Sequence, residues 1–295
     1  MLTLRSADEL VAAVPYLLGY HPDNDLVVVA LRDRQVELTL CAEQPADPSV
    51  AADLCRRHGV TSALILGYGG GERGTGRLAD ELRRAGVPVL EELRVHDGHY
   101  WSPADPHRRR PIPTSSVAAA SATYHGLRAL PSRAALAAEQ APVSGAEREA
   151  MTAATRRAEA RMAAMERKAP TEEKLKRAVR RAGVISVRAA ERRHRAGGRL
   201  KDLPAAWLTV LLARSFVFGS VWNAPRDDLQ GLWTDLVRRA DERYVAGPAC
   251  LLAYVAWRSG QGSVARIAVD RALAADPDHK MAGALDAMLY AVRPR

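Results

Sequence analysis

Residues 6–31, SADELVAAVPYLLGYHPDNDLVVVAL, combine a helix, its stop signal and an apolar run in one continuous stretch. Ser6 and Glu9 have the spacing of a capping box, in which each side chain bonds the other residue's backbone N–H at the start of a helix. Gly19 supplies a left-handed helix end, and Pro22 prevents the helix from resuming. The stretch therefore predicts a helix that ends immediately before a buried strand.

Alternating strands and helices are expected around this stretch, up to about residue 101. The apolar run at 25–31 predicts a strand, and the turn after it predicts an antiparallel partner at 36–41. Asp97 and Gly98 have the composition of a hairpin turn. Strands that alternate with helices indicate an α/β layer with a mixed sheet. The other elements expected here are a helix between Asp47 and Gly59, a strand at 60–66, a helix at 77–85 and a strand at 87–95.

Only helical patterns follow residue 115, after a loop rich in proline and arginine at 102–113. Residues 139–145, EQAPVSG, have the composition of a linker. We therefore predict an α+β fold, with an α/β domain at 1–138 and an all-α domain at 146–295. The helices expected in the second domain are 146–168, one that begins at Pro170, and about 203–219, 227–244, 248–259, 263–275 and 278–291.

The positive charge of the chain is concentrated in one segment. The net charge is +9, and residues 146–201 alone carry 17 lysines and arginines against 7 acidic residues. Like-charged residues four apart on a helix repel unless an anion lies between them. The segment therefore predicts nucleic-acid binding, with a solvated helix face as the alternative, since it has no aromatic residue on which bases could stack. The candidate contacts are Arg177, Arg180, Arg181, Arg188 and Arg192.

A narrow apolar seam runs along the predicted helix at 146–168. Its members recur every three or four residues, so they lie on one face of the helix. Such a seam fits a partner helix, either within this chain or from another subunit. It favours partner binding or self-association through the helical domain. The members are Met151, Ala154, Ala158, Met162 and Met165.

The loop at 67–76 contains a G-x-G-x-x-G pattern at Gly69, Gly71 and Gly74. In dinucleotide-binding proteins this pattern lets backbone N–H groups face a pyrophosphate, and a carboxylate about 20 residues further on holds the ribose. The carboxylates at 91–92 stand at about that spacing. A run of glycines produces such a match easily, and no lysine follows as a P-loop requires. A plain surface loop is the alternative, and no cofactor is expected.

The sequence contains no recognisable catalytic or metal-binding motif. The nearest candidate is His96, Asp97 and His99 around the expected hairpin, where exposed turn residues are the simpler interpretation. The three cysteines are scattered. No apolar run reaches the roughly 18 residues of a membrane-spanning helix, and the N-terminus lacks the pattern of a signal peptide. We therefore expect a reduced, cytoplasmic, non-enzymatic protein without a metal ion or a membrane partner.

The segment at 248–291 resembles one tetratricopeptide repeat. Small residues within 253–272 let two helices approach closely, Gly260 permits the turn between them, and Pro277 ends the second helix. One repeat cannot bury its own apolar faces. The hairpin must therefore pack on the preceding helices or on a partner.

Three stretches together resemble an actinobacterial family, the domain of unknown function 4192. They lie at 4–31, 87–102 and 247–279, so the resemblance covers most of the chain but leaves out the basic segment 146–201. Relatives tend to carry cysteines after the dipeptide that corresponds to Trp101-Ser102, and this chain has none there. A metal or redox role at this position therefore cannot be transferred from the relatives to this chain. The resemblance also supplies no reaction, ligand or partner.

In that family the first and last stretches recur together, and we therefore expect the two ends of the chain to meet. A helix stop alone does not require Tyr20, His21 and Asp25. These residues are candidates for a ligand crevice that Trp257 and Arg258 would complete. A shared packing interface is the alternative.

These features predict a cytoplasmic adaptor or regulatory protein that engages a partner through its helical half. Nucleic-acid binding through the helices of 146–201 is the first alternative. The second is a nucleotide or small-molecule site, with or without catalysis, at the 67–76 loop or at the crevice.

Overall fold

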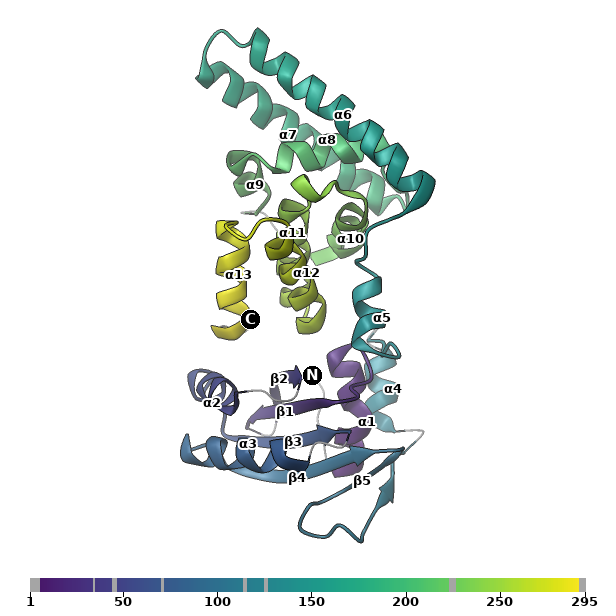
Figure 1. Cartoon of the computed structure of the whole chain (residues 1–295), viewed down its shortest axis with the longest axis vertical. Coiled ribbons are helices and arrows are strands. Elements are labelled where there is room, and N and C mark those ends of the chain that lie inside the picture. The colour runs from purple at the N-terminus through teal and green to yellow at the C-terminus, as the bar shows by residue number, and fades with distance from the viewer. Residues whose placement is uncertain are drawn as a thin grey trace. The chain divides into compact units, whose positions relative to one another are not determined.

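The structure, a computed structural model, describes residues 6–33, 35–43, 47–69, 72–113, 116–124, 127–222 and 227–291. These residues form two compact units, each with its own apolar core. The sheet unit extends to Leu136, and the helical unit runs from Ala137 to Leu289. Figure 1 shows the strands gathered in the sheet unit, while the described part of the helical unit consists of helices and loops. The predicted α+β fold is confirmed.

The sheet has the strand order β2-β1-β3-β4-β5-β6. β1 pairs antiparallel with β2 on one side and with β3 on the other, while β3 and β4 are parallel. β5 and β6 continue the sheet in antiparallel register, so the predicted mixed pairing is confirmed. The strands are β1 (Asp25–Arg32), β2 (Gln35–Glu43), β3 (Ser62–Tyr68), β4 (Val89–His96), β5 (His99–Trp101) and β6 (Arg110–Pro111).

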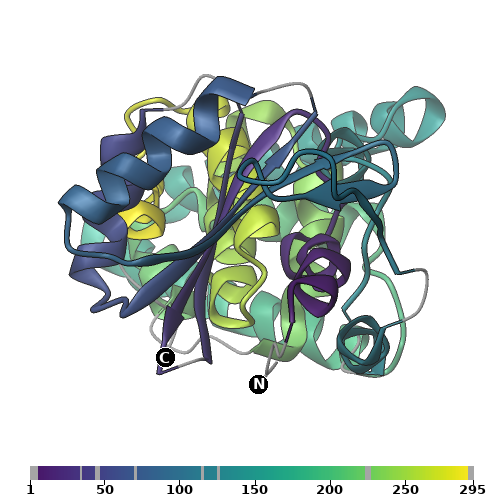
Figure 2. The same cartoon turned by 90° about the horizontal axis from the view of Figure 1, so that it is seen from below.

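Helices cover both faces of this sheet (Figure 2). Side chains alternate along a strand, so Leu26 and Val28 of β1 pack into the core formed with α2 and α3. Their neighbours Val27 and Val29 face the other side, where α1 lies, and are also buried. The helices of the sheet unit are α1 (Ala7–Leu18), α2 (Pro48–Arg57), α3 (Glu72–Arg84) and α4 (Val117–Tyr124).

The predicted ends of the first helix and the predicted hairpin turn form in the structure. The hydroxyl of Ser6 accepts a hydrogen bond from the backbone N–H of Glu9 at 3.3 Å, which caps α1. Gly19 ends the helix with a φ of 82°, a value that glycine adopts without strain. Asp97 and Gly98 also take positive φ and turn β4 into β5. The predicted helix stop and hairpin turn are confirmed.

Two details of the sheet unit differ from the expectation. α3 begins at Glu72 rather than at residue 77, because Gly74 and Gly76 adopt the helical conformation that glycine generally disfavours. β6, at Arg110–Pro111, was expected to be loop, and its pairing with β5 is a tertiary contact that local composition does not encode.

The helical unit contains long helices joined by short connections. Figure 1 shows α6 lying across α7 and α8. The helix α5 (Arg133–Ala138) spans the boundary between the units. The others are α6 (Gly145–Lys168), α7 (Glu172–Arg195), α8 (Asp202–Leu212), α9 (Ser215–Trp222), α10 (Gln230–Arg239), α11 (Ala246–Arg258), α12 (Gly262–Ala275) and α13 (Lys280–Ala291).

The single helix predicted at 203–219 is wrong, because the chain bends by 100° between α8 and α9. Arg214 lies at the bend and forms an ion pair with Glu166 of α6, which turns this charged residue out of the apolar run. Within the described residues, no single helix has the length and apolar character to cross a membrane, although this bent pair meets the same criteria when taken together. The helix expected at 227–244 is also shorter, since two 3₁₀ turns flank α10.

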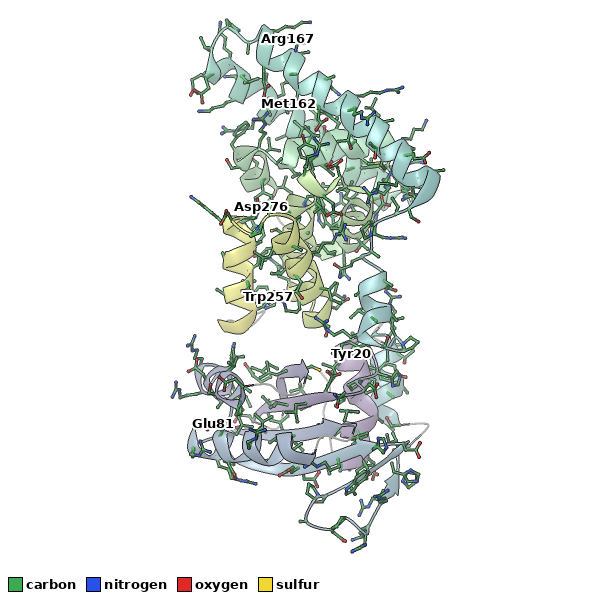
Figure 3. The ribbon with its side chains drawn as sticks, in the orientation of Figure 1. Tyr20, Glu81, Met162, Arg167, Trp257 and Asp276 are labelled. Atoms are coloured by element: carbon green, nitrogen blue, oxygen red, sulfur yellow. The ribbon has the colours of Figure 1, made fainter. Side chains whose placement is uncertain are left out.

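The apolar seam of α6 has its partner within the chain. Met151, Ala154, Ala158 and Met162 are buried in the core of the helical unit, and α6 packs on α8. Figure 3 places Met162 on the inner side of α6. The seam is therefore not available to another subunit.

The hairpin formed by α11 and α12 closes this core. Gly260 takes a φ of 76° at the turn, which is the left-handed conformation that glycine favours. Ala253, Ala256, Ala265 and Ala272 are fully buried, so small side chains let the two helices approach closely, as the sequence predicts.

Candidate functional site: a cationic groove on the helical unit

An open groove lies between α6, α7 and α8. Its volume is about 690 Å³, and its lining comes from segments that are far apart in the sequence. α6 contributes Arg161, the α7–α8 loop contributes Leu200, and α8 contributes Leu203, Pro204 and Trp207. One long face of α7 provides the rest of the wall: Lys174, Arg177, Ala178, Arg181, Ala182, Ile185, Ser186 and Ala189. We call this feature the α7 groove.

The helical period explains why α7 presents this face. The lining residues recur at spacings of three and four, which places them on one side of the helix. The opposite side carries Val179, Gly183, Val187 and Ala190, all buried in the unit. A methyl group on Gly183 would lie 2.5 Å from Cγ1 of Val217, so glycine is what lets α9 approach this side. α7 thus has a packed inner face and an open groove face.

Apolar side chains form the floor of the groove. Ile185 is 57% exposed and Leu203 is 45% exposed, although both are large aliphatic residues. Trp207 is only 5% exposed, because its other neighbours are core residues and Arg161 lies over its ring. The guanidinium carbon of Arg161 stands 4.2 Å from the ring centroid, a cation–π contact.

Four cations border this floor, and none of the described residues that line it is acidic. Lys174, Arg177 and Arg181 are exposed, and within the described residues their side chains form no ion pair. The neighbouring Lys176, which does not line the groove, is different. Its ammonium lies 2.8 Å from Glu172, and this contact raises the pKa of Lys176 above its ordinary value. The groove therefore combines exposed apolar surface with unneutralised positive charge.

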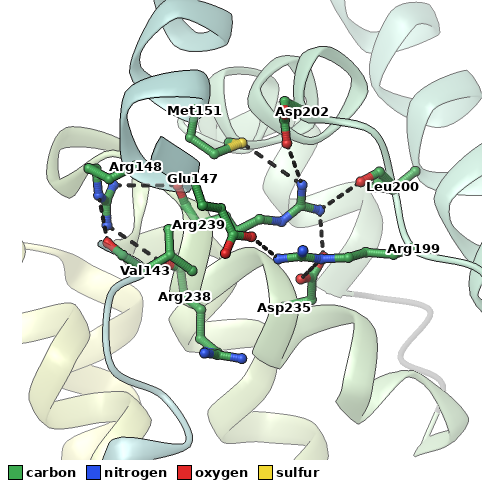
Figure 4. A network of polar contacts seen from close by, with 10 residues as sticks. All are labelled: Val143, Glu147, Arg148, Met151, Arg199, Leu200, Asp202, Asp235, Arg238 and Arg239. Carbon is green, nitrogen blue, oxygen red and sulfur yellow. Dashed lines mark hydrogen bonds and ion pairs between the residues drawn. The ribbon is translucent and has the colours of Figure 1, made fainter. Parts of the chain in front are cut away.

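A polar network around the buried Arg239 includes Leu200, one of the residues that line the groove (Figure 4). Arg239 of α10 is 1% exposed, and it donates to Asp202 at 3.1 Å, to Asp235 at 2.5 Å and to the carbonyl of Leu200 at 3.0 Å. Arg199 bonds Asp235 at 2.6 Å and also pairs with Glu147 of α6. The network ties α6 and α10 to the loop that leads into α8.

The structure brings together four of the five predicted nucleic-acid contacts. Arg177 and Arg181 line the groove, and Arg188 and Arg192 follow on the same face of α7 by their spacing. Arg180 lies elsewhere, with its guanidinium carbon 5.9 Å from the ring centroid of Phe216 on α9. All five side chains are exposed.

Sequence reasoning missed Arg161, Lys174, Leu203 and Trp207 as members of one site. The available signal was Ile185, a large aliphatic residue among the arginines of α7 that cannot belong to its buried face. That signal identifies a surface, whereas the fold is needed to show which helices complete it.

The predicted nucleotide site falls partly outside the described residues, since Gly71 is not among them. Gly69 has a φ of 74°, and a methyl group there would lie 2.8 Å from the carbonyl oxygen of Asp23. This close approach accounts for the glycine without a ligand. Gly74 lies in the first turns of α3, and the Glu92 carboxylate accepts a hydrogen bond from the buried hydroxyl of Thr75. Nucleotide binding here stays a prediction.

The first half of the predicted crevice lies at one end of the sheet. Tyr20 and Asp25 are buried, and the hydroxyl of Tyr20 lies 3.1 Å from Sγ of Cys41. Burial raises the pKa of the Cys41 thiol to about 12. His21 is exposed, and its backbone N–H bonds the carbonyl of Leu130 at 2.8 Å. The contact between Tyr20 and Cys41 ties the segment after α1 to β2.

The second half of the predicted crevice belongs to the helical unit. Tyr254 and Trp257 of α11 stack with ring centroids 6.0 Å apart, and the guanidinium carbon of Arg258 lies 5.9 Å from the Tyr254 ring centroid. The ring of Trp222 also contacts Tyr254, with the two ring centroids 4.3 Å apart. A crevice formed from residues of both units stays a prediction.

The described part of the chain holds no group of three or more His, Cys, Asp or Glu side chains that could bind a metal ion. His96 and His99 flank their turn as exposed residues, and Nδ1 of His99 lies 2.8 Å from the carbonyl oxygen of Asp97. The three cysteines are free thiols.

The fold defines an α+β protein whose helical unit carries an open, cation-bordered groove. The chain belongs to the family described as Domain of unknown function (DUF4192), whose model matches residues 8–295. No curated protein and no solved structure shows significant similarity to it.

Proposed function

We propose that this chain is a cytoplasmic, non-enzymatic adaptor or regulatory protein that binds a protein partner at the α7 groove. One observation carries the proposal: Ile185 and Leu203 expose aliphatic surface inside a border of cations that lack acidic partners in the described part of the chain. Apolar patches rimmed by polar residues are typical of interaction sites. The three free thiols agree with a reducing compartment.

The test is site-specific photo-cross-linking in cells of the source organism. A photoreactive amino acid at position 185 should form an adduct with another protein. The same amino acid at the exposed Asp278, which does not line the groove, should not form that adduct. The absence of any protein adduct from position 185, or the same adducts from both positions, would contradict the proposal.

Nucleic-acid binding is the second candidate, and a continuous basic stripe on α7 favours it. Lys174, Arg177, Arg181, Arg188 and Arg192 share one face and span about 27 Å at 1.5 Å per residue. Five phosphate contacts predict that the logarithm of the binding constant falls with the logarithm of salt concentration at a slope of about −4.5. Titration of duplex DNA at several salt concentrations measures this slope, and a slope near zero contradicts the candidate.

A further inference from the structure

We infer that the occupant of the α7 groove is an acidic amphipathic helix of a partner protein, which lies along α7 with its apolar side toward Ile185 and Leu203. This inference rests on the proposed function and adds the chemistry of the partner. It follows from the shape of the α7 face, from the charge around it and from the character of the floor.

Small side chains make the α7 face suitable for another helix. Ala178, Ala182 and Ser186 follow one another at intervals of four residues, and Ala189 continues their row. Rows at this interval form the ridges and grooves through which helices pack at 8–10 Å between axes. A row of small residues leaves a shallow channel, and the side chains of an incoming helix can enter it. The exposed Ile185 then contributes aliphatic surface at the centre of the contact.

The charge of the groove selects an acidic helix. Lys174, Arg177 and Arg181 stand along one border and Arg161 along the other, with no acidic residue among the described residues of the lining. Arg177 and Arg181 are four residues apart on one helix, an arrangement of like charges that is destabilising by itself. Carboxylates beside the apolar stripe of an incoming helix neutralise both borders, as charged residues beside a coiled-coil seam do. A basic helix would add to the repulsion.

The floor favours a peptide over a nucleic acid. Nucleic acids contact protein through phosphates and through bases that stack on exposed aromatic rings. The aromatic ring of the groove, Trp207, is 5% exposed and lies under Arg161, so it offers no stacking surface. Ile185 and Leu203 would remain exposed beneath a phosphate backbone, whereas the apolar side of a helix removes them from water.

Three labelled probes test the inference by fluorescence anisotropy with the full chain. The first is an 18-residue helical peptide with leucine and alanine at spacings of three and four and glutamates beside them. The second has lysine in place of every glutamate, and the third is a 20-base-pair DNA duplex. We expect the glutamate peptide to bind at least tenfold more tightly than the lysine peptide and to resist competition by the duplex. Equal binding of the two peptides, no binding of the glutamate peptide, or its displacement by an equal concentration of the duplex would overturn the inference.

Charge reversal locates the binding surface. Arg177→Glu with Arg181→Glu should weaken binding of the glutamate peptide at least tenfold. Arg156→Glu with Arg180→Glu makes the same change in net charge at exposed positions outside the groove, and it should change binding less than twofold. Equal losses in the two variants would overturn the inference. If the inference fails while position 185 still cross-links to a protein, the proposed function stands with a partner of different chemistry.

Discussion

In the sheet unit, several of the polar side chains that stand out in the sequence lie in the interior. Tyr20 and Asp25 are buried at one end of the sheet beside the partly buried Cys41, and the hydroxyl of the buried Tyr68 has no hydrogen-bond partner among the described residues. In the helical unit, the arginines that stand out lie on the open face of α7. The first set makes contacts within the fold, whereas the exposure of the second set is the basis on which we propose a role in recognition.

The same distinction holds within the helical unit. Arg239 is enclosed by carboxylates and a backbone carbonyl, whereas Arg177 and Arg181 have no such partners within the described residues. Residue type alone therefore does not decide the role of an arginine here. Burial and the availability of a carboxylate decide it.

The largest expected effect follows from removing Arg239. Arg239→Met removes the three hydrogen bonds that this buried side chain donates to Asp202, Asp235 and Leu200, and a hydrogen bond to a charged group generally contributes about 1.5–3 kcal/mol. The helical unit should lose stability by this amount and the sheet unit should not. Urea denaturation of chain labelled with 5-fluorotryptophan measures both, because Trp233 reports on the helical unit and Trp101 on the sheet unit. An unchanged unfolding midpoint for Trp233 would show that the network does not stabilise the helical unit.

Alkaline pH should destabilise the sheet unit more than the helical unit. Burial raises the pKa of Cys41 to about 12 and of Cys55 to about 11 in the sheet unit, and of Cys250 to about 12 in the helical unit. In the unfolded chain these thiols ionise near pH 8.5, so their contribution is complete below that pH and is lost as pH rises toward the native values.

Each thiol lowers the free energy of unfolding by about 1.4 kcal/mol per pH unit in this range, so at pH 10 the sheet unit should lose about 2 kcal/mol more than the helical unit. The fluorotryptophan resonances, followed in urea between pH 7 and pH 10, measure both losses. Cys55→Ala should roughly halve the slope of the sheet unit. Parallel slopes for the two units would contradict the account.

A smaller effect on stability is expected when a methyl group is added at two glycines, one on the packed inner face of α7 and one at an open position of α9. Gly183→Ala forces a methyl group against Val217 and should cost about 1–3 kcal/mol through overpacking. Gly219→Ala is the matched control, because a methyl group there meets nothing within 4 Å and α9 gains helix propensity. We expect thermal denaturation to show a lower Tm for the first variant and an equal or higher Tm for the second. The opposite order would contradict the packing described for α7 and α9.

The smallest effect on stability is expected in the groove itself. Ile185→Ala should change the free energy of unfolding by less than about 0.5 kcal/mol, since the side chain is largely exposed. Val187→Ala, two residues along on the inner face, should cost more than 1 kcal/mol because it opens a cavity. Chemical denaturation of the two variants compares them directly, and equal losses would mean that Ile185 belongs to the core.

Several elements could be predicted because their signals are local. Ser6 and Gly19 mark the ends of α1, and Asp97 with Gly98 marks the hairpin, through backbone geometry that neighbouring residues determine. The bend between α8 and α9 could not be predicted in this way. The apolar run is continuous in sequence except for Arg214, and the contact of that residue with Glu166 depends on the tertiary fold.

The groove was predictable only in part, for the same physical reason. The positive charge of α7 is visible in the sequence, and Arg177 and Arg181 were candidates on that basis. The floor depends on Leu203 and Trp207 of α8, and the opposite border depends on Arg161 of α6. The sequence leaves open whether the helix that packs on the α6 seam belongs to this chain or to another subunit. Only the fold shows that this helix is α8.

Quantitative affinity purification from cells of the source organism tests most directly whether the outward-facing chemistry of α7 serves recognition. Three tagged full-length chains are compared: the unaltered chain, Arg177→Glu with Arg181→Glu, and Arg156→Glu with Arg180→Glu. The account predicts at least one protein that the unaltered chain and the second variant retain in similar amounts and that the first variant loses at least tenfold. The same set of retained proteins for all three chains would contradict it.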